Sequence, residues 1–599
     1  MILQSLYKYS ERIHPGSLAF NDDRVHWILD IDLKGHLLGL TFTGEKKDKG
    51  VGYRHPRFCI PMMTEDWGKS RSGTKVSPQY LLDNFEYLFG LCADRKKAKR
   101  ATKCSDGFHQ KLAQVADRTG SKPLKAFLKC LKETMRNPKI IMDFLETAGG
   151  IDIHHRSGRR GTAPKHWNKS QSIMVRIGGK SIFDYPEIRR DWEECYSQAL
   201  QASEEKVQCM VTGKVGAPTK LHRKIKLIGT QGAGAPLICF NDPSFESFGK
   251  KGNDNAPMCA EASERIAMAM EALLRSDSNR YILPSGATVL FFTGDAKYED
   301  FFARILEGDA ETVKEFYRAP YTGYQPEPDT HCEDFHSFIL RGESGRISIR
   351  SVLVKDHRQV LEALRQHYVD LDIGMEYPLK IKGILRSAFK SSDENAFFGG
   401  SEEQLYLAAV SGAPYPRGIL QGLVSQCCHL PQGHSRQEQS SKYAGFLRVA
   451  ASYGKAYINR AIRAGTITKY KPLEEILDKS NTSVPYRMGR LLAVLERLRR
   501  RAIPNSPLLS EIAMSMFMQR PRLAIDVHYA NHVHHIRKLK ERGAWYKTII
   551  GEIMGGIQVN GIPTRLSVED RVSVVLGYEH QKEELFKPNR KEKEETEAE

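Results

Sequence analysis

The segment from Ile228 to Pro257 concentrates side chains that could contact a polyanion. Glycines let backbone N–H groups approach a phosphate closely, amide side chains offer donors and acceptors suited to base edges, and adjacent lysines add fixed positive charge. The residues with these properties are Gly229, Gln231, Gly232, Gly234, Asn241, Lys250, Lys251, Asn253 and Asn255. The segment predicts nucleic-acid contacts. The open alternative is a structural loop, in which asparagines close turns around a buried strand at Leu237–Phe240.

Three further basic stretches could bind phosphates. Two loops, Gly44–His55 and Trp67–Pro78, are too rich in Gly, Ser and Lys to belong to a core. Their candidate contacts are Lys46, Lys47, Lys49, Lys69, Arg71 and Lys75. The third, the irregular stretch His154–Lys169, adds Arg159 and Arg160 and could stack Trp167 on a base. Solvated loops that bind nothing are the alternative.

The overall charge points to acidic partners. A formal net charge of +18 favours nucleic acid or anionic lipid. No apolar run approaches the roughly 20 residues that span a bilayer, and the N-terminus lacks the basic-then-apolar order of a signal peptide. We therefore expect a cytoplasmic protein that binds nucleic acid rather than a membrane.

Metal and disulfide chemistry are weakly indicated. The 11 cysteines are an odd number and contain no CxxC pair, so we expect reduced thiols. Cys427, Cys428, His429 and His434 could approach one ion, but a second ligand pair at zinc-finger spacing is missing. We expect no metal and no other cofactor.

A search for catalytic motifs yields little. The sequence has no GxxxxGK[ST] phosphate loop, no HExxH and no GxSxG. Asp30 with Asp32, or Asp370 with Asp372, could bind Mg²⁺ in a nuclease. Such acid-x-acid pairs are commonly the exposed face of a strand or the start of a helix. We therefore expect no enzyme, and we keep a Mg²⁺-dependent nuclease and a stand-alone nucleic-acid-binding protein as alternatives.

The elements that must position these residues divide the chain in two. Alternating apolar residues predict a hairpin from VHWILDID and HLLGLTFT, and further hairpins at Tyr281–Gly294 and Phe335–Val354. Beyond about residue 380, segments such as MGRLLAVLERLRRR have helical periodicity only. The predicted fold class is α+β: a mixed N-terminal region with β-hairpins and basic loops, followed by an all-α C-terminal helical bundle.

The predicted domain boundaries follow from this change of pattern. Residues 1–375 form the α+β domain with the DNA-recognition loops, and residues 376–585 form the helical bundle. Residues 586–599 are strongly charged and nearly free of apolar side chains, so we expect a disordered tail.

Several segments together resemble one known family. They are ILQSLYKYSERI near the N-terminus, DNFEYLFG, the block from Cys209 to Pro257, RISIR and RMGRLLAVLERLRRRA. In this order they resemble the large subunit of the type I-C CRISPR Cascade complex, over nearly the whole chain. The long central block is the most specific of these segments.

The resemblance implies a non-catalytic role in antiviral defence. The large subunit of this family reads the protospacer-adjacent motif (PAM) of target double-stranded DNA, while guide pairing reads the remaining sequence, and it helps to open and hold the R-loop. The implied partners are crRNA, target DNA, the Cascade backbone, crRNA-handle and small subunits, and a recruited helicase-nuclease. The helical C-terminus is similar to the small subunit, which internal translation from Met488 could produce separately.

Overall fold

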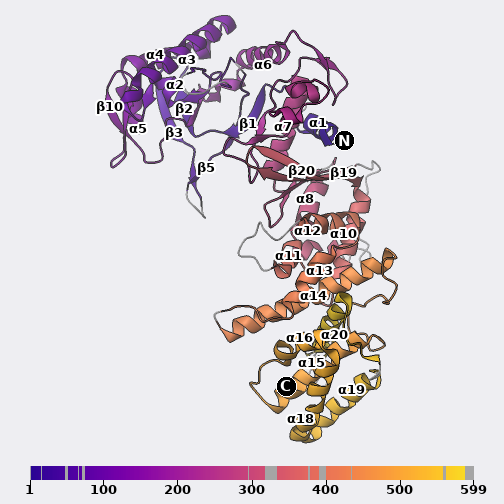
Figure 1. The fold of residues 1–599 in the computed structure, drawn as a ribbon. Helices are drawn as coiled ribbons and strands as arrows, with labels where there is room; N and C mark the ends of the chain where they lie inside the picture. The colour runs from indigo at the N-terminus through magenta and orange to yellow at the C-terminus, as the bar shows by residue number, and fades with distance from the viewer. Residues whose placement is uncertain are drawn as a thin grey trace. The chain divides into compact units, whose positions relative to one another are not determined.

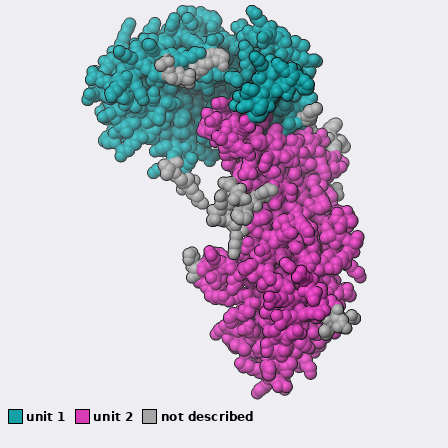
Figure 2. Space-filling model, in the orientation of Figure 1, with its two compact units in different colours: residues 1–223, 238–270 teal, residues 224–237, 271–599 magenta. Residues whose placement is uncertain are grey.

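The computed structural model describes residues 2–14, 16–47, 52–64, 66–69, 75–294, 296–313, 315–316, 334–375, 378–389, 400–433, 435–557 and 561–586 (Figure 1). The chain forms two compact units, coloured separately in Figure 2. Unit 1 comprises residues 1–223 and 238–270, and unit 2 comprises residues 224–237 and 271–599. The Ile228–Pro257 segment is therefore shared between the units.

Unit 1 combines small sheets with helices around one core. Its strands are β1 (Phe20–Arg24), β2 (Trp27–Ile31), β3 (Leu37–Phe42), β4 (Glu45–Lys46), β5 (Tyr53–Arg54), β6 (Arg57–Pro61), β7 (Asp83–Asn84), β8 (Leu91–Cys92), β9 (Ile151–His155), β10 (Arg160–Ala163), β11 (Ser172–Ile177), β12 (Lys180–Ser181), β13 (Val207–Gln208) and β14 (Val215–Gly216). Its helices are α1 (Ile2–Ile13), α2 (Phe85–Phe89), α3 (Ala98–Thr119), α4 (Lys122–Arg136), α5 (Lys139–Leu145), α6 (Pro186–Gln201) and α7 (Ala260–Arg275), whose last turn belongs to unit 2.

The predicted N-terminal hairpin is confirmed as β2 and β3, which pair antiparallel. Strand β2 also pairs in parallel with β11, so it lies in the middle of its sheet. Trp27, Leu29 and Ile31 are buried at alternate positions, as a period of two requires. They share a core with apolar residues of α3 and α4.

Unit 2 begins with strands and continues as helices. Its strands are β15 (Lys224–Ile225), β16 (Ala235–Pro236), β17 (Arg280–Ile282), β18 (Thr288–Phe292), β19 (Asp334–Glu343) and β20 (Arg346–Asp356). Its helices are α8 (Ala296–Leu306), α10 (His357–Leu371), α11 (Ile381–Ala388), α12 (Ser401–Ser411), α13 (Arg417–Gln426), α14 (Arg436–Arg463), α15 (Val484–Ala502), α16 (Leu509–Gln519), α17 (Pro521–Ala530), α18 (His532–Leu539), α19 (Gly543–Gly555) and α20 (Val568–Phe586).

Both predicted hairpins of unit 2 are confirmed, because β17–β18 and β19–β20 pair antiparallel in one four-stranded sheet. Beyond Asp356 the described residues contain helices and no strand. The predicted α+β class with a helical C-terminus is confirmed. Within the described residues, no helix has the length and apolar character needed to cross a membrane. The charged tail predicted at 586–599 lies outside the described residues, except for Phe586 at the end of α20.

Helices α14 and α15 both pack on α20 (Figure 1), and three glycines allow the close approach. A Cβ atom at Gly489 of α15 would lie 1.9 Å from the carbonyl oxygen of Val574. A Cβ atom at Gly577 of α20 would lie 2.1 Å from the backbone carbonyl oxygen of Tyr486. A Cβ atom at Gly454 of α14 would lie 2.2 Å from a methyl carbon of Val572. Any larger residue would force these helices apart. Met488, the hypothetical internal start, is completely buried beside Gly489.

Gly489→Ala should lower the melting temperature of the helical part by several degrees, because overpacking costs about 1–3 kcal/mol. Gly445→Ala in α14 is the matched control, since a Cβ there meets nothing within 4 Å. In a helix interior alanine is favoured over glycine by about 1 kcal/mol, so the control should melt at the same temperature or higher. Scanning calorimetry distinguishes the two. Equal shifts for both variants would contradict the close-packing account.

Candidate nucleic-acid interface

The loop from 238 to 257 in unit 1, called here the amide loop, has no core of its own. Each of its residues is at least partly exposed, and its only regular elements are two single 3₁₀ turns, Pro243–Phe245 and Gly252–Asn255. The predicted strand at Leu237–Phe240 does not form. Hydrogen bonds rather than apolar burial must therefore hold the loop together.

Two asparagine side chains supply five of these hydrogen bonds. The Nδ2 of Asn255 donates to the carbonyl oxygens of Lys250 at 3.0 Å and Gly252 at 2.9 Å, while its Oδ1 accepts the N–H of Ser247 at 2.9 Å. The Nδ2 of Asn253 donates to the oxygens of Thr219 and Lys220, both at 3.0 Å. Asn255 thus closes a turn, as the structural alternative held, whereas Asn253 ties the loop to the segment at Thr219 and Lys220. Base contact by either residue stays a prediction, and it would compete with these bonds.

Backbone hydrogen bonds fasten the end of the amide loop to the preceding segment. Met210 donates to Pro257, Thr219 donates to Met258, and Ala260 donates to Ala217, each at 2.9 Å. The Cys209–Lys220 segment and the end of the amide loop therefore form one unit of structure.

The charged groups of the amide loop are mixed. Lys250 and Lys251 are exposed, as is the predicted base-reading amide of Asn241. Two of the loop carboxylates have backbone partners: Asp242 accepts the N–H of Ser244 at 2.9 Å, and Glu246 accepts that of Gly252 at 3.0 Å. Lys250 and Lys251 are thus the cationic groups of the loop that a polyanion could contact. Lys214 and Lys220, on the adjacent segment, are exposed as well.

The first part of the predicted segment lies in unit 2, where its glycines have a packing role. The N–H of Ser344 donates to Gly229 at 2.8 Å, and that of Gln231 donates to Ser344 at 2.9 Å. A Cβ at Gly229 would lie 2.3 Å from the Gly342 oxygen, and one at Gly234 would lie 2.7 Å from the Ile225 oxygen. Both glycines therefore approach protein backbone and not open space. Gly232 meets nothing within 4 Å, and Gln231 is exposed.

The N-terminal basic loops place lysines at the surface. Lys46 lies on β4 opposite Tyr53 of β5, and Lys47 donates its N–H to Gly52 at 3.3 Å. The base of this hairpin packs on Phe42, whose ring centroid lies 5.1 Å from that of Tyr53. Lys69 and Lys75 are also exposed. Lys49 and Arg71 lie outside the described residues.

The predicted irregular stretch His154–Lys169 is mostly a hairpin, formed by β9 and β10. Trp167 is only 4% exposed, because its ring packs against Phe85 at a centroid distance of 5.5 Å. The prediction that Trp167 could stack on a base is therefore wrong. Arg159 and Arg160 remain exposed on the hairpin and could contact a phosphate. Two other cations there are engaged, because Arg156 pairs with Asp106 and Lys169 with Glu86, whereas Lys165 is exposed.

The carboxylates proposed for a nuclease have structural partners. Asp30 accepts two hydrogen bonds from Arg176, at 2.7 and 2.8 Å. The backbone N–H and imidazole of His36 lower the pKa of Asp32 to about 2. Asp370 is buried against Arg460 at 2.9 Å.

Among the described residues, no three His, Cys, Asp or Glu side chains gather as metal ligands. Burial raises the pKa of Cys427, and His434 lies outside the described part.

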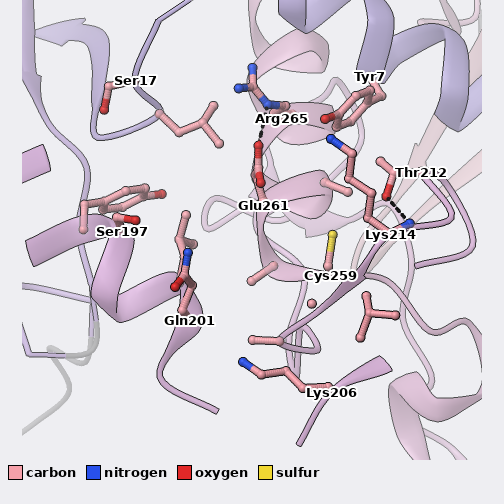
Figure 3. A pocket seen from close by; sticks show the side chains of 18 of the residues that line it. Tyr7, Ser17, Ser197, Gln201, Lys206, Thr212, Lys214, Cys259, Glu261 and Arg265 are labelled. Atoms are coloured by element: carbon pink, nitrogen blue, oxygen red, sulfur yellow. Dashed lines mark hydrogen bonds and ion pairs between the residues drawn. The ribbon is translucent and has the colours of Figure 1, made fainter. Parts of the chain in front are cut away.

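A cavity of about 570 Å³ in unit 1 was not anticipated from the sequence (Figure 3). Tyr7 of α1, Gln201 of α6, Arg265 of α7 and Cys259 contribute to its wall. Arg265 is already paired with Glu261 at 3.2 Å. None of the predicted nucleic-acid-binding residues that the structure describes lines this cavity, but Lys214, one of the exposed lysines beside the amide loop, does.

Asn255→Ala should loosen the amide loop without unfolding the protein, because three hydrogen bonds are lost in a region that has no core. At about 1 kcal/mol for each bond, exchange of the loop amides should accelerate by roughly 100-fold. Hydrogen–deuterium exchange followed by mass spectrometry measures this effect. Asn241→Ala serves as the control at an exposed asparagine. Unchanged protection in Asn255→Ala would show that another contact holds the loop.

Comparison with known protein families gives a match over nearly the whole chain. The family model for CRISPR-associated proteins of the Cas_Csd1 type matches residues 6–586, which is nearly the whole chain. No curated protein matches the sequence. Because the family match spans both units, it covers the amide loop, the basic hairpins and the helical C-terminus alike. The chain therefore belongs to the Cas_Csd1 family of CRISPR-associated proteins.

Proposed function

We propose that this protein is the large subunit of a type I-C Cascade particle and reads the protospacer-adjacent motif of target double-stranded DNA. The observation that carries the proposal is the amide loop, which is braced by its own asparagines and exposes Asn241, Lys250 and Lys251. Membership of the Cas_Csd1 family indicates a Cascade-type protein, and a crRNA-guided complex with other Cas subunits follows from it.

Motif reading suits a loop of this kind. A protein that reads only a short motif needs few base contacts, because pairing with the guide RNA supplies the remaining specificity. Amides and lysines can serve either groove, and in the minor groove they distinguish A·T from G·C. Exposed Gln231, Lys46, Lys47, Lys69, Lys75, Arg159 and Arg160 are the further contacts that we propose for DNA or crRNA.

We further propose that the chain is not an enzyme and acts in the cytoplasm. Three of the four acids that a nuclease would use, Asp30, Asp32 and Asp370, are bonded to Arg176, His36 and Arg460, and Asp372 accepts the N–H of Gly374. Cleavage would then belong to a helicase-nuclease recruited after the R-loop opens. The helical C-terminus, whose helix α18 has no buried residue and carries Arg537 and Lys538, would help to hold the displaced strand beside the small subunits.

Omission of this chain tests the proposal directly. Particles would be assembled with one guide, the backbone and crRNA-handle subunits, with and without this protein, and bound to duplexes carrying a randomised flanking trinucleotide. Sequencing of the bound fraction should show a motif preference only when the chain is present. A preference that survives omission, or a chain that never joins the particle, would refute motif reading.

Lys250→Ala combined with Lys251→Ala should weaken binding to every flanking sequence about equally, because phosphate contacts carry no sequence information. Each lost contact should reduce the slope of log K against log salt by about 0.9. Titrations at several salt concentrations measure both effects. The matched control is Lys122→Ala with Lys125→Ala, since these exposed lysines lie on α4. An unchanged slope, or a loss confined to the preferred motif, would remove the lysines from the phosphate contacts.

A further inference from the structure

Phe248, at the tip of the amide loop, is 99% exposed. No other large apolar side chain recorded as exposed in the described residues reaches this value, and the next, Leu221, is 82% exposed. Complete burial of a phenylalanine side chain is worth about 1.5–3 kcal/mol. In the isolated chain Phe248 gains none of this burial free energy, so its side chain is a candidate for contact with a partner.

The backbone at Phe248 is also unfavourable for its residue type. The N–H of Lys250 donates to Ser247 at 3.0 Å, so residues 247–250 form a β-turn. Its two central residues both have positive φ, +54° at Phe248 and +71° at Gly249. Turns of this kind favour Gly, Asn or Asp, and a bulky residue there costs about 1–2 kcal/mol. Phenylalanine thus occupies a position for which its own side chain is poorly suited.

The turn is nevertheless held firmly at both ends by one side chain. Asn255 accepts the N–H of Ser247 through Oδ1 at 2.9 Å and donates to the oxygen of Lys250 through Nδ2 at 3.0 Å. The first and last residues of the turn are therefore clamped together, and the strained conformation is maintained. A strained residue that the surrounding structure enforces is a pattern typical of functional sites.

We propose that the ring of Phe248 inserts at a base step of duplex DNA, next to the motif that the amide loop reads. This inference rests on the proposed function. Nucleic acid fits better than a protein partner because Lys250 and Lys251 follow the turn directly and can hold phosphates while the ring stacks on a base. Apolar side chains that enter a base step unstack it and bend the duplex, which would help strand opening to begin.

Phe248→Asn separates this role from a structural one. Asparagine tolerates positive φ, so the melting temperature of the variant should equal or exceed that of the parent protein. Binding of the assembled particle to a motif-containing duplex should nevertheless fall about 10-fold, because base stacking is worth about 1–3 kcal/mol. Phe248→Trp should retain the parent affinity. The control is Phe144→Ala on α5, where the side chain is 43% exposed, and it should bind as the parent does.

A second duplex identifies the step. When the base pair beside the motif is mismatched, unstacking is already partly complete, and Phe248→Asn should bind it within about 2-fold of the parent. Parent-like binding of Phe248→Asn to the intact duplex would overturn the inference, as would a loss of binding that is fully explained by failed particle assembly. Either result leaves motif reading intact if the parent particle still depends on this chain for its preference. If the parent particle shows no such dependence, the proposed function itself fails.

Discussion

The clamp that Asn255 places across residues 247–250 is the contact on which the candidate interface depends. The amide loop buries none of its residues, so it lacks the apolar burial that stabilises most of the chain. Three hydrogen bonds from one side chain replace that burial, and Asn253 ties the loop to Thr219 and Lys220. A short polar residue is needed because only an amide of this length can bond both ends of the turn at once.

The helical part of unit 2 is held by a different principle. Gly489 and Gly577 bring α15 and α20 into backbone contact, which maximises the number of close atom pairs. A charge buried there has partners: Arg460 is 3% exposed and donates to Asp370 at 2.9 Å and to the oxygens of Ala408 and Ala413. Removal of either member of that ion pair would leave an uncompensated charge in the core.

The two principles suit two tasks. Each unit has an apolar core that stabilises it, and a stable scaffold can retain a locally unfavourable residue such as Phe248. The loop can then present lysines, amides and one aromatic ring without folding inward around them. The same division explains why the acid pairs are engaged: Asp30, Asp32 and Asp370 hold backbone and cationic partners in the scaffold and are not gathered at an open site.

The sequence by itself determined the local elements and the class of fold. Alternation in β2 and β3 and helical periodicity in α15 are properties of neighbouring residues, so the hairpins, the helical C-terminus and the α+β class were predictable. The family resemblance was likewise carried by contiguous segments. Only the tertiary structure decided which residues are available to a partner, because availability depends on contacts between distant parts of the chain. The ring of Trp167 packs against Phe85, and the backbone of Gly342 fills the space beside Gly229. The amide of Asn253 is bonded to Thr219, whereas the side chain of Phe248 is left exposed. No spacing along the sequence encodes those encounters.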